Sequence, residues 1–145
     1  MLIVLEGCDG SGKTTIANNL KAIMPDAEII HCTTETPNTF EFFHGLIWAS
    51  KDRDIIADRF CYGQFVYQAP DERKLTAEEL YHLEVDMIAV GSKVIHVTAS
   101  VETIRKRLSW RKEECPVSVI TSRYCDLFER TLIKPHLWWT GSDTD

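Results

Sequence analysis

One stretch constrains the fold more than any other. Residues 7 to 14 read GCDGSGKT, directly after the apolar run LIVL and a single glutamate. Glycines in such a stretch can take backbone dihedrals closed to other residues, so several N–H groups can point into one hollow and surround an anion. The next residues, TTIANNLKAI, place Ile16, Ala17, Leu20 and Ile23 at helical spacing, and a helix N-terminus adds partial positive charge there. The spacing GxxxxGK[ST], between a strand and a helix, is the P-loop (Walker A) pattern.

The pattern assigns roles to individual residues. Lys13 is expected to reach the β- and γ-phosphates of a nucleotide, and the Thr14 hydroxyl to hold Mg²⁺. The alternative, a glycine-rich turn that merely ends a strand, would match the whole pattern only rarely by chance. We therefore predict nucleotide binding through these phosphate-binding residues: Gly7, Gly10, Ser11, Gly12, Lys13, Thr14 and Thr15.

The whole chain sets limits on the rest. Its 145 residues suit one domain, 1–145, and the net charge of −6 argues against a nucleic-acid partner. No run approaches the length of a membrane span, and the start MLIVLEG is too short for a secretion signal, so we expect a cytoplasmic protein without membrane contact. The five cysteines form no CxxC pair, which indicates reduced thiols rather than disulfides or zinc.

Strand and helix signals alternate along the chain. Apolar runs predict strands at 2–5, 27–31, 54–58 and 93–99, with a weaker signal at 136–140 whose Trp138 and Trp139 we expect to cover the edge of the sheet. Helical spacing predicts helices at 14–23, 39–51, 76–90, 100–114 and 119–134. This alternation predicts an α/β fold in three layers, with a parallel sheet of four or five strands and helices on both faces.

A second group of functional residues follows the strand at 54–58. This strand ends in Asp58 and Arg59, which should deliver both side chains to the carboxyl edge of the sheet, where α/β folds bind ligands. The carboxylate of Asp58 can order Mg²⁺ or its waters, and the guanidinium of Arg59 can grip a phosphate bidentately. The alternative is an acid and a base paired to solvent at a strand end, which is less favoured beside a P-loop.

These two motifs together resemble the thymidylate kinases, and more loosely the deoxynucleoside kinases. Thymidylate kinases open with EGxDGxGK[ST]T, which matches residues 6–15, and continue with DR[YHF], which matches Asp58, Arg59 and Phe60. The resemblance implies a P-loop NTPase fold with strand order 2-3-1-4-5, ATP and Mg²⁺ as cofactors, and small-molecule nucleotide substrates. It also leaves room for a homodimer.

The resemblance assigns acceptor-binding residues. It places Asp9 beside the acceptor's sugar and phosphate, Arg59 on the acceptor phosphate, and Gln64 with Tyr67 in the base pocket. Asp9 could alternatively stabilise only the turn. On the helix at 39–51, Phe43 is a candidate to stack on the acceptor base, although its helical spacing favours a core position.

A basic segment, RKRLSWRK at 105–112, is the candidate lid. Lys13 is the only basic side chain of the phosphate loop, so negative charge developing on the transferred phosphoryl group needs another cation. Arg107 and Arg111 stand at i and i+4 and would share one helix face. In thymidylate kinases whose phosphate loop lacks an extra arginine, a mobile lid at this place supplies the charge, here around 100–118. A solvated basic helix face is the alternative.

Because the chain departs from the family's pattern at two places, the sequence does not identify the base of the acceptor nucleotide. Residues 33–39, TTETPNT, keep Glu35 and Pro37 of the family's phosphate motif but have no arginine, and the helix at 39–51 has no base-reading arginine either. We predict an ATP- and Mg²⁺-dependent nucleoside monophosphate kinase, with a dTMP-like deoxynucleotide as the favoured acceptor. The alternatives are a deoxynucleoside kinase and a P-loop module that binds nucleotide without transferring phosphate.

Overall fold

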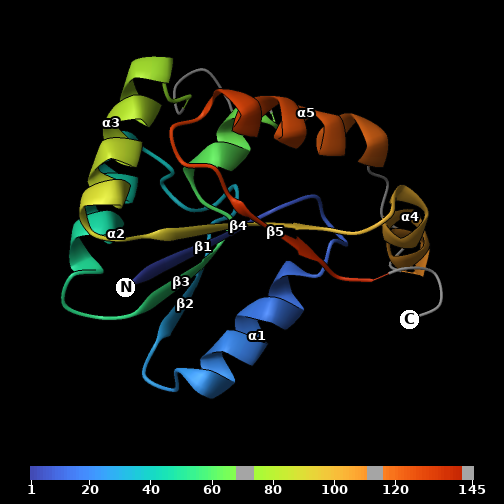
Figure 1. Cartoon of the computed structure of the whole chain (residues 1–145), viewed down its shortest axis with the longest axis horizontal. Coiled ribbons are helices and arrows are strands. Elements are labelled where there is room, and N and C mark those ends of the chain that lie inside the picture. Colours follow the sequence, from blue (N-terminus) through green and yellow to red (C-terminus); the bar gives the residue numbers. More distant parts are fainter. Residues whose placement is uncertain (68–73, 111–115, 142–145) are drawn as a thin grey trace.

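Helices and strands alternate along the chain as the apolar spacing predicts (Figure 1). The computed structural model describes residues 1–67, 74–110 and 116–141. Its strands are β1 (Leu2–Glu6), β2 (Glu28–His31), β3 (Ile55–Asp58), β4 (Lys93–Thr98) and β5 (His136–Trp139). Its helices are α1 (Lys13–Ile23), α2 (Phe40–Ala49), α3 (Ala77–Ala89), α4 (Val101–Trp110) and α5 (Val117–Arg130), with a short 3-10 helix, η1 (Cys61–Phe65), after β3.

All five strands are parallel and lie in the order β2-β3-β1-β4-β5. Both the predicted fold class and the strand order are therefore confirmed, and the weak signal at 136–140 is a true fifth strand. In the central register Leu5 of β1 pairs with Asp58 of β3, and Glu6 pairs with His96 of β4. The order along the sheet reverses at β1, so the residues after β1 and β3 meet at the carboxyl edge where such folds bind ligands.

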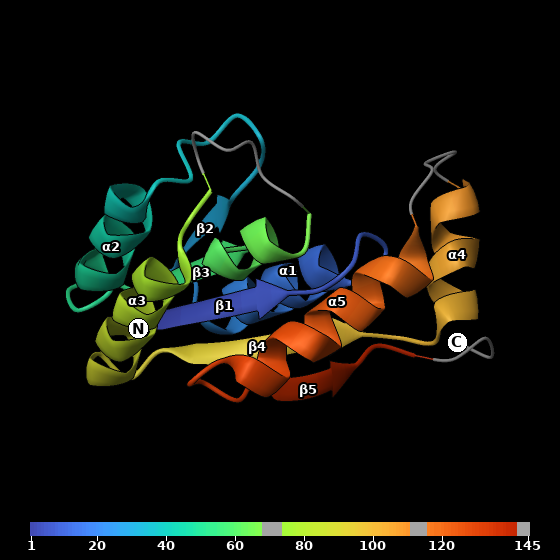
Figure 2. The same ribbon diagram turned by 90° about the horizontal axis from the view of Figure 1, so that it is seen from above.

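The central strands separate two apolar layers. Leu2 and Val4 of β1 belong to the cluster formed with α2, α3 and α5, whereas Ile3 and Leu5 belong to the cluster formed with α1. Figures 1 and 2 show the same division, with α1 on one face of the sheet and α2, α3 and α5 on the other. Strands buried on both faces must be apolar on both sides, which explains why β1 and β3 are continuous apolar runs in the sequence.

Helix ends follow local chemistry. At the start of α3 the Thr76 hydroxyl accepts a hydrogen bond from the N–H of Glu79 at 3.1 Å, and the Glu79 carboxylate accepts one from the N–H of Thr76 at 2.9 Å. Together these bonds form a capping box, which the T-x-x-E spacing of residues 76–79 favours. The expected apolar stripe of α1 is wrong at its last member, because Ile23 is 77% exposed at the end of the helix.

The edge strand β5 also corrects an expectation. Trp138 and Trp139 do not cover the sheet edge, since they belong to the edge strand itself and both are exposed. Among the described residues, no helix combines the length and the apolar character that crossing a membrane requires.

Candidate active site

The phosphate loop, residues 7–12, leads from β1 into α1. Gly10 and Gly12 have φ of +82° and +106°, in the left-handed region that favours glycine. A Cβ atom on Gly7 would lie 2.2 Å from the carbonyl oxygen of Val97, so β4 leaves no room for a side chain there. No side chain caps the N-terminus of α1, so its first N–H groups can serve an anion.

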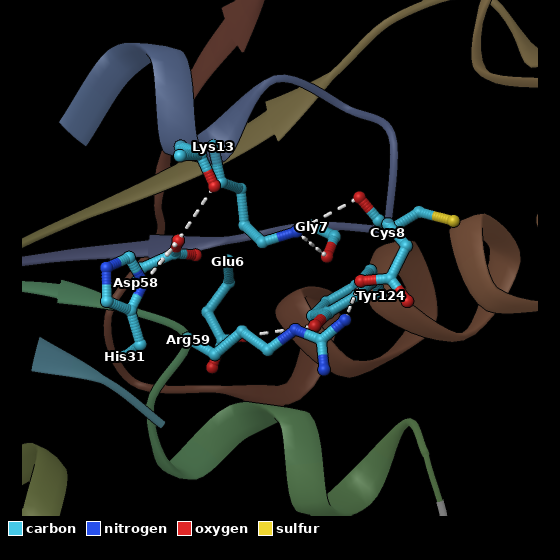
Figure 3. Close-up of polar contacts among 10 residues, drawn as sticks. Glu6, Gly7, Cys8, Lys13, His31, Asp58, Arg59 and Tyr124 are labelled. Atoms are coloured by element: carbon cyan, nitrogen blue, oxygen red, sulfur yellow. Dashed lines mark hydrogen bonds and ion pairs between the residues drawn. The ribbon is translucent and has the colours of Figure 1, made fainter. Parts of the chain in front are cut away.

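A cavity of about 290 Å³ opens beside this loop. Lys13 lies at its wall and donates hydrogen bonds from Nζ to the carbonyl oxygens of Gly7 at 2.8 Å and Cys8 at 3.1 Å (Figure 3). Of the predicted phosphate-binding residues, all but Gly7 and the buried Ser11 line the cavity. The full lining is Asp9, Gly10, Gly12, Lys13, Thr14, Thr15, His31, Cys32, Thr33, Asp58 and Arg59.

One corner of the cavity fits a magnesium ion. Thr14 Oγ1 donates a hydrogen bond to Asp58 Oδ2 at 3.1 Å, which leaves the hydroxyl lone pairs free to ligate a cation. Asp58 Oδ2 also lies 3.0 Å from His31 Nδ1 (Figure 3), a contact that the sequence reasoning missed. The register of β2 and β3 pairs His31 with Asp58, so a strand pairing reveals it. Hydroxyl and carboxylate oxygens suit Mg²⁺, and both predicted metal ligands are therefore placed together.

Arg59 lies across the cavity from Lys13 in a strained conformation. Its φ is +69°, unusual for a residue other than glycine, and its N–H donates to the carbonyl of Leu5 at 2.8 Å. The guanidinium forms an ion pair with Asp9, and its carbon lies 4.7 Å from the centre of the Tyr67 ring. The structure thus brings together Asp9, Arg59 and Tyr67, three of the predicted acceptor-binding residues.

The other two predicted acceptor-binding residues lie in internal contacts. The Gln64 side chain is buried, donates to the carbonyl of Asn38 and accepts from the N–H of Leu75 at 2.9 Å. Phe43 is 0% exposed and packs edge-on against Phe60, with ring centres 4.8 Å apart. For both residues, contact with an acceptor base stays a prediction.

Arg107 of α4 contacts the outer side of the phosphate loop. Its Nη1 donates to the carbonyl of Gly10 at 3.1 Å and to Thr140 Oγ1 at 3.2 Å. A Cβ atom on Gly10 would lie 3.1 Å from the side chain of Leu108, so α4 packs directly on the loop. Arg111, the other predicted lid arginine, lies outside the described residues.

A second cavity, of about 420 Å³, lies on this outer side of the loop. The sequence reasoning missed the part played by Trp138 and Trp139, which are exposed aromatic side chains in its wall beside Arg107. Aromatic rings and a guanidinium plane are the surfaces on which a nucleobase stacks. The lining residues are Gly10, Gly12, Thr15, Ile16, Asn19, Arg107, Trp138, Trp139 and Thr140, so the two cavities share Gly10, Gly12 and Thr15.

Beneath the phosphate loop lies Glu6, which is 0% exposed. Burial raises the pKa of Glu6 to about 7, although hydrogen bonds and the positive charges of Lys13 and Arg59 act in the opposite direction. The neighbouring His96 packs on the rings of Tyr124 and Phe128, and burial lowers its pKa. His96 is therefore a packed core residue.

Several solved structures have the same arrangement, whereas no family model and no curated protein sequence matches the chain. The YorR protein from Bacillus subtilis, solved in complex with phosphorylated GDP, is 29% identical, with a TM-score of 0.81 over 98% of this chain and 87% of that one. Deoxyadenosine kinase from M. mycoides with bound dCTP is 17% identical, with a TM-score of 0.59 over 100% and 92%. Thymidylate kinase from Candida albicans is 19% identical, with a TM-score of 0.56 over 97% and 84%. The chain therefore has the fold of the P-loop nucleotide kinases.

Proposed function

We propose that the protein is a nucleoside monophosphate kinase that transfers the γ-phosphoryl group of ATP, in the presence of Mg²⁺, to a deoxynucleoside monophosphate, with a dTMP-like acceptor favoured. Thr14 and Asp58 would hold Mg²⁺, which would supply positive charge to neutralise the phosphates. The chain's own residues would bind and orient the two substrates: Lys13 and the phosphate loop the donor, and Asp9 and Arg59 the acceptor.

The observation that carries this proposal is the place of Arg59. A nucleotide donor needs the phosphate loop and Lys13 alone, but Arg59 adds a guanidinium on the opposite wall of the same cavity. Asp9 and Tyr67 hold that guanidinium in place while no phosphate neutralises it. A monophosphate acceptor would supply that phosphate, whereas an unphosphorylated nucleoside would leave the guanidinium in its ion pair with Asp9.

The second cavity supports a place for the base of the donor. It adjoins the phosphate loop at Gly10 and Gly12, and the exposed rings of Trp138 and Trp139 offer the stacking surface. Arg107 reaches both this cavity and the loop, which supports the proposed role of α4 as part of a lid over residues 100–118.

A screen for ADP release over nucleosides, monophosphates and oligonucleotides tests the reaction, and Arg59→Ala tests the acceptor class. Loss of a bidentate phosphate contact worth about 1.5 to 3 kcal/mol should raise the acceptor KM at least tenfold with little change in the ATP KM. Arg53→Ala is the matched control, because Arg53 pairs with Glu28 at 3.4 Å on the surface. A nucleoside turned over with a KM that Arg59→Ala leaves unchanged would instead favour a deoxynucleoside kinase, and tight nucleotide binding without ADP release a non-catalytic module.

Guanine nucleotides are the second candidate substrates. YorR, solved with phosphorylated GDP, is 29% identical to this chain, above the 17% and 19% of the two named kinases. The screen should therefore include guanosine and deoxyguanosine phosphates as acceptors, and GTP beside ATP as donor. A homodimer and a cytoplasmic location also remain proposals, and light scattering on the purified chain measures the first.

A further inference from the structure

Glu6 is a buried carboxylate with three hydrogen-bond donors. The N–H groups of Phe60 and Gly63 both lie 3.1 Å from its Oε2, and the Tyr124 hydroxyl lies 3.0 Å from its Oε1. None of these donors belongs to β1, which carries Glu6: two are in the segment after β3 and one is on α5. Glu6 is 0% exposed and lines neither of the two cavities described above.

One of the two backbone donors to Glu6 belongs to Phe60, the residue that follows Arg59 in the chain. The N–H of Arg59 is bonded to the carbonyl of Leu5, and the next N–H, of Phe60, is bonded to the Glu6 carboxylate. These two bonds, to consecutive residues of β1, therefore hold the peptide groups on both sides of Arg59. A left-handed backbone on an arginine persists only where its surroundings impose it, and these bonds do so.

The tyrosine donor, Tyr124, is connected to the side chain of Arg59 through a second tyrosine. Tyr124, which is bonded to Glu6, meets the ring of Tyr67 edge-on with ring centres 6.2 Å apart. Tyr67 in turn lies under the guanidinium of Arg59. Figure 3 shows the Arg59 side chain extending past Glu6 toward Tyr124. Glu6 is thus connected to the backbone of Arg59 through Phe60, and to its guanidinium through Tyr124 and Tyr67.

We propose that Glu6 is a positioning residue for the acceptor: its carboxylate imposes the left-handed backbone of Arg59 and, through Tyr124 and Tyr67, the place of the guanidinium that receives the acceptor phosphate. This inference rests on the proposed monophosphate kinase activity. A substitution of Glu6 should therefore weaken binding of the acceptor more than binding of ATP.

Glu84 supplies a matched control. It is also buried, and its carboxylate also accepts from two backbone N–H groups, those of Leu132 at 3.1 Å and Ile133 at 2.9 Å, and from one tyrosine hydroxyl, that of Tyr62 at 3.0 Å. Glu84 lies on α3 and lines neither cavity. Glu6→Met and Glu84→Met therefore remove equivalent sets of hydrogen bonds, one set connected to Arg59 and the other not.

The experiment measures the KM of both substrates, kcat and the thermal midpoint for these variants. For Glu6→Met we expect the acceptor KM to rise at least tenfold with the ATP KM within threefold of the wild type. For Glu84→Met we expect a similar loss of thermal stability with both KM values within threefold. Glu6→Gln should restore the acceptor KM to within about threefold, since its amide oxygen can still accept from Phe60 and Gly63.

A double variant asks whether Glu6 acts through Arg59. Arg59→Ala removes the guanidinium that Glu6 would position. Adding Glu6→Met to Arg59→Ala should therefore change the acceptor KM by less than about twofold. If Glu6→Met does not fold, Glu6→Asp replaces it, since it keeps the charge but retracts the carboxylate by one methylene, and the same direction of change is expected.

The outcomes separate the two proposals. If Arg59→Ala leaves the acceptor KM unchanged, the proposed function fails first. If Arg59→Ala raises it but a folded Glu6→Met or Glu6→Asp does not, the inference about Glu6 is overturned while the function stands. Equal rises in the donor and acceptor KM, or full additivity with Arg59→Ala, would also overturn it, since both indicate a general distortion.

Discussion

The ionisation of Glu6 should make the stability of the protein depend on pH in an unusual direction. Burial raises the pKa of Glu6 from its ordinary 4.5 to about 7 in the folded chain. Between these two values the folded state holds a proton that the unfolded state has released, so the free energy of unfolding falls as pH rises. Most buried carboxylates that form ion pairs show the opposite slope, because their pKa is lowered.

The size of the effect follows from the two pKa values. Linkage between pH 6 and pH 8 gives a loss of about 1 kcal/mol of unfolding free energy from this one group. Over the full pH range the loss is about 3 kcal/mol. His96 acts in the opposite sense below its ordinary pKa of 6.5, because its pKa is lowered and its protonation favours the unfolded state. The contribution of Glu6 must therefore be read as a difference between two proteins.

Urea unfolding of the wild type and of Glu6→Gln at pH 6 and pH 8 measures that difference. The neutral amide keeps the shape and the acceptor for Phe60 and Gly63 but cannot ionise. We expect the free energy of unfolding to fall between pH 6 and pH 8 by about 1 kcal/mol more in the wild type than in the variant. Glu84→Gln is the control, because it changes a second buried glutamate that also accepts from two backbone N–H groups and one tyrosine hydroxyl. Parallel pH profiles for the wild type and Glu6→Gln would refute the reasoning.

Four variants test the rest of the site. Lys13→Ala should lower kcat at least a hundredfold in a chain that still folds by circular dichroism, because several kcal/mol of transition-state stabilisation is lost, and retention of a tenth of the wild-type rate would contradict the assignment. Arg107→Ala combined with Arg111→Ala should lower kcat by roughly two orders of magnitude with a smaller change in ATP affinity by calorimetry; an unchanged kcat would indicate a solvated helix face. Trp139→Ala should raise the ATP KM about tenfold and spare the acceptor KM, since one stacking contact with a base is worth about 1 to 3 kcal/mol; the reverse pattern would place the donor base elsewhere. Gly10→Ala should lower the thermal midpoint by several degrees, because Gly10 has φ +82° and its Cβ would press on Leu108 of α4; an unchanged midpoint would show that α4 does not pack on the loop in solution.

Much of the fold could be predicted because its signals are local. The P-loop spacing, the apolar strands and the capping box at Thr76 and Glu79 each act within a few residues, and each appears where the sequence places it. The weak signal at 136–140 belongs to an edge strand of four residues, which are all exposed although three of them are apolar, so apolar character alone does not show where they lie. Its tryptophans were therefore misread as a cover for the sheet.

By itself the sequence determined the phosphate loop, the parallel sheet and the choice of Thr14 and Asp58 as candidate metal ligands, because the glycine spacing and the carboxyl ends of apolar strands admit few other arrangements. Only the tertiary structure decided which side chains surround these residues. His31 beside Asp58, Trp138 and Trp139 beside Arg107, and Glu6 beneath Arg59 all come from segments distant in the chain. The physical reason is that strand register and helix packing, which no local pattern encodes, bring such residues into contact. The same packing buries Glu6, the last residue of β1, where its carboxylate accepts hydrogen bonds from three donors.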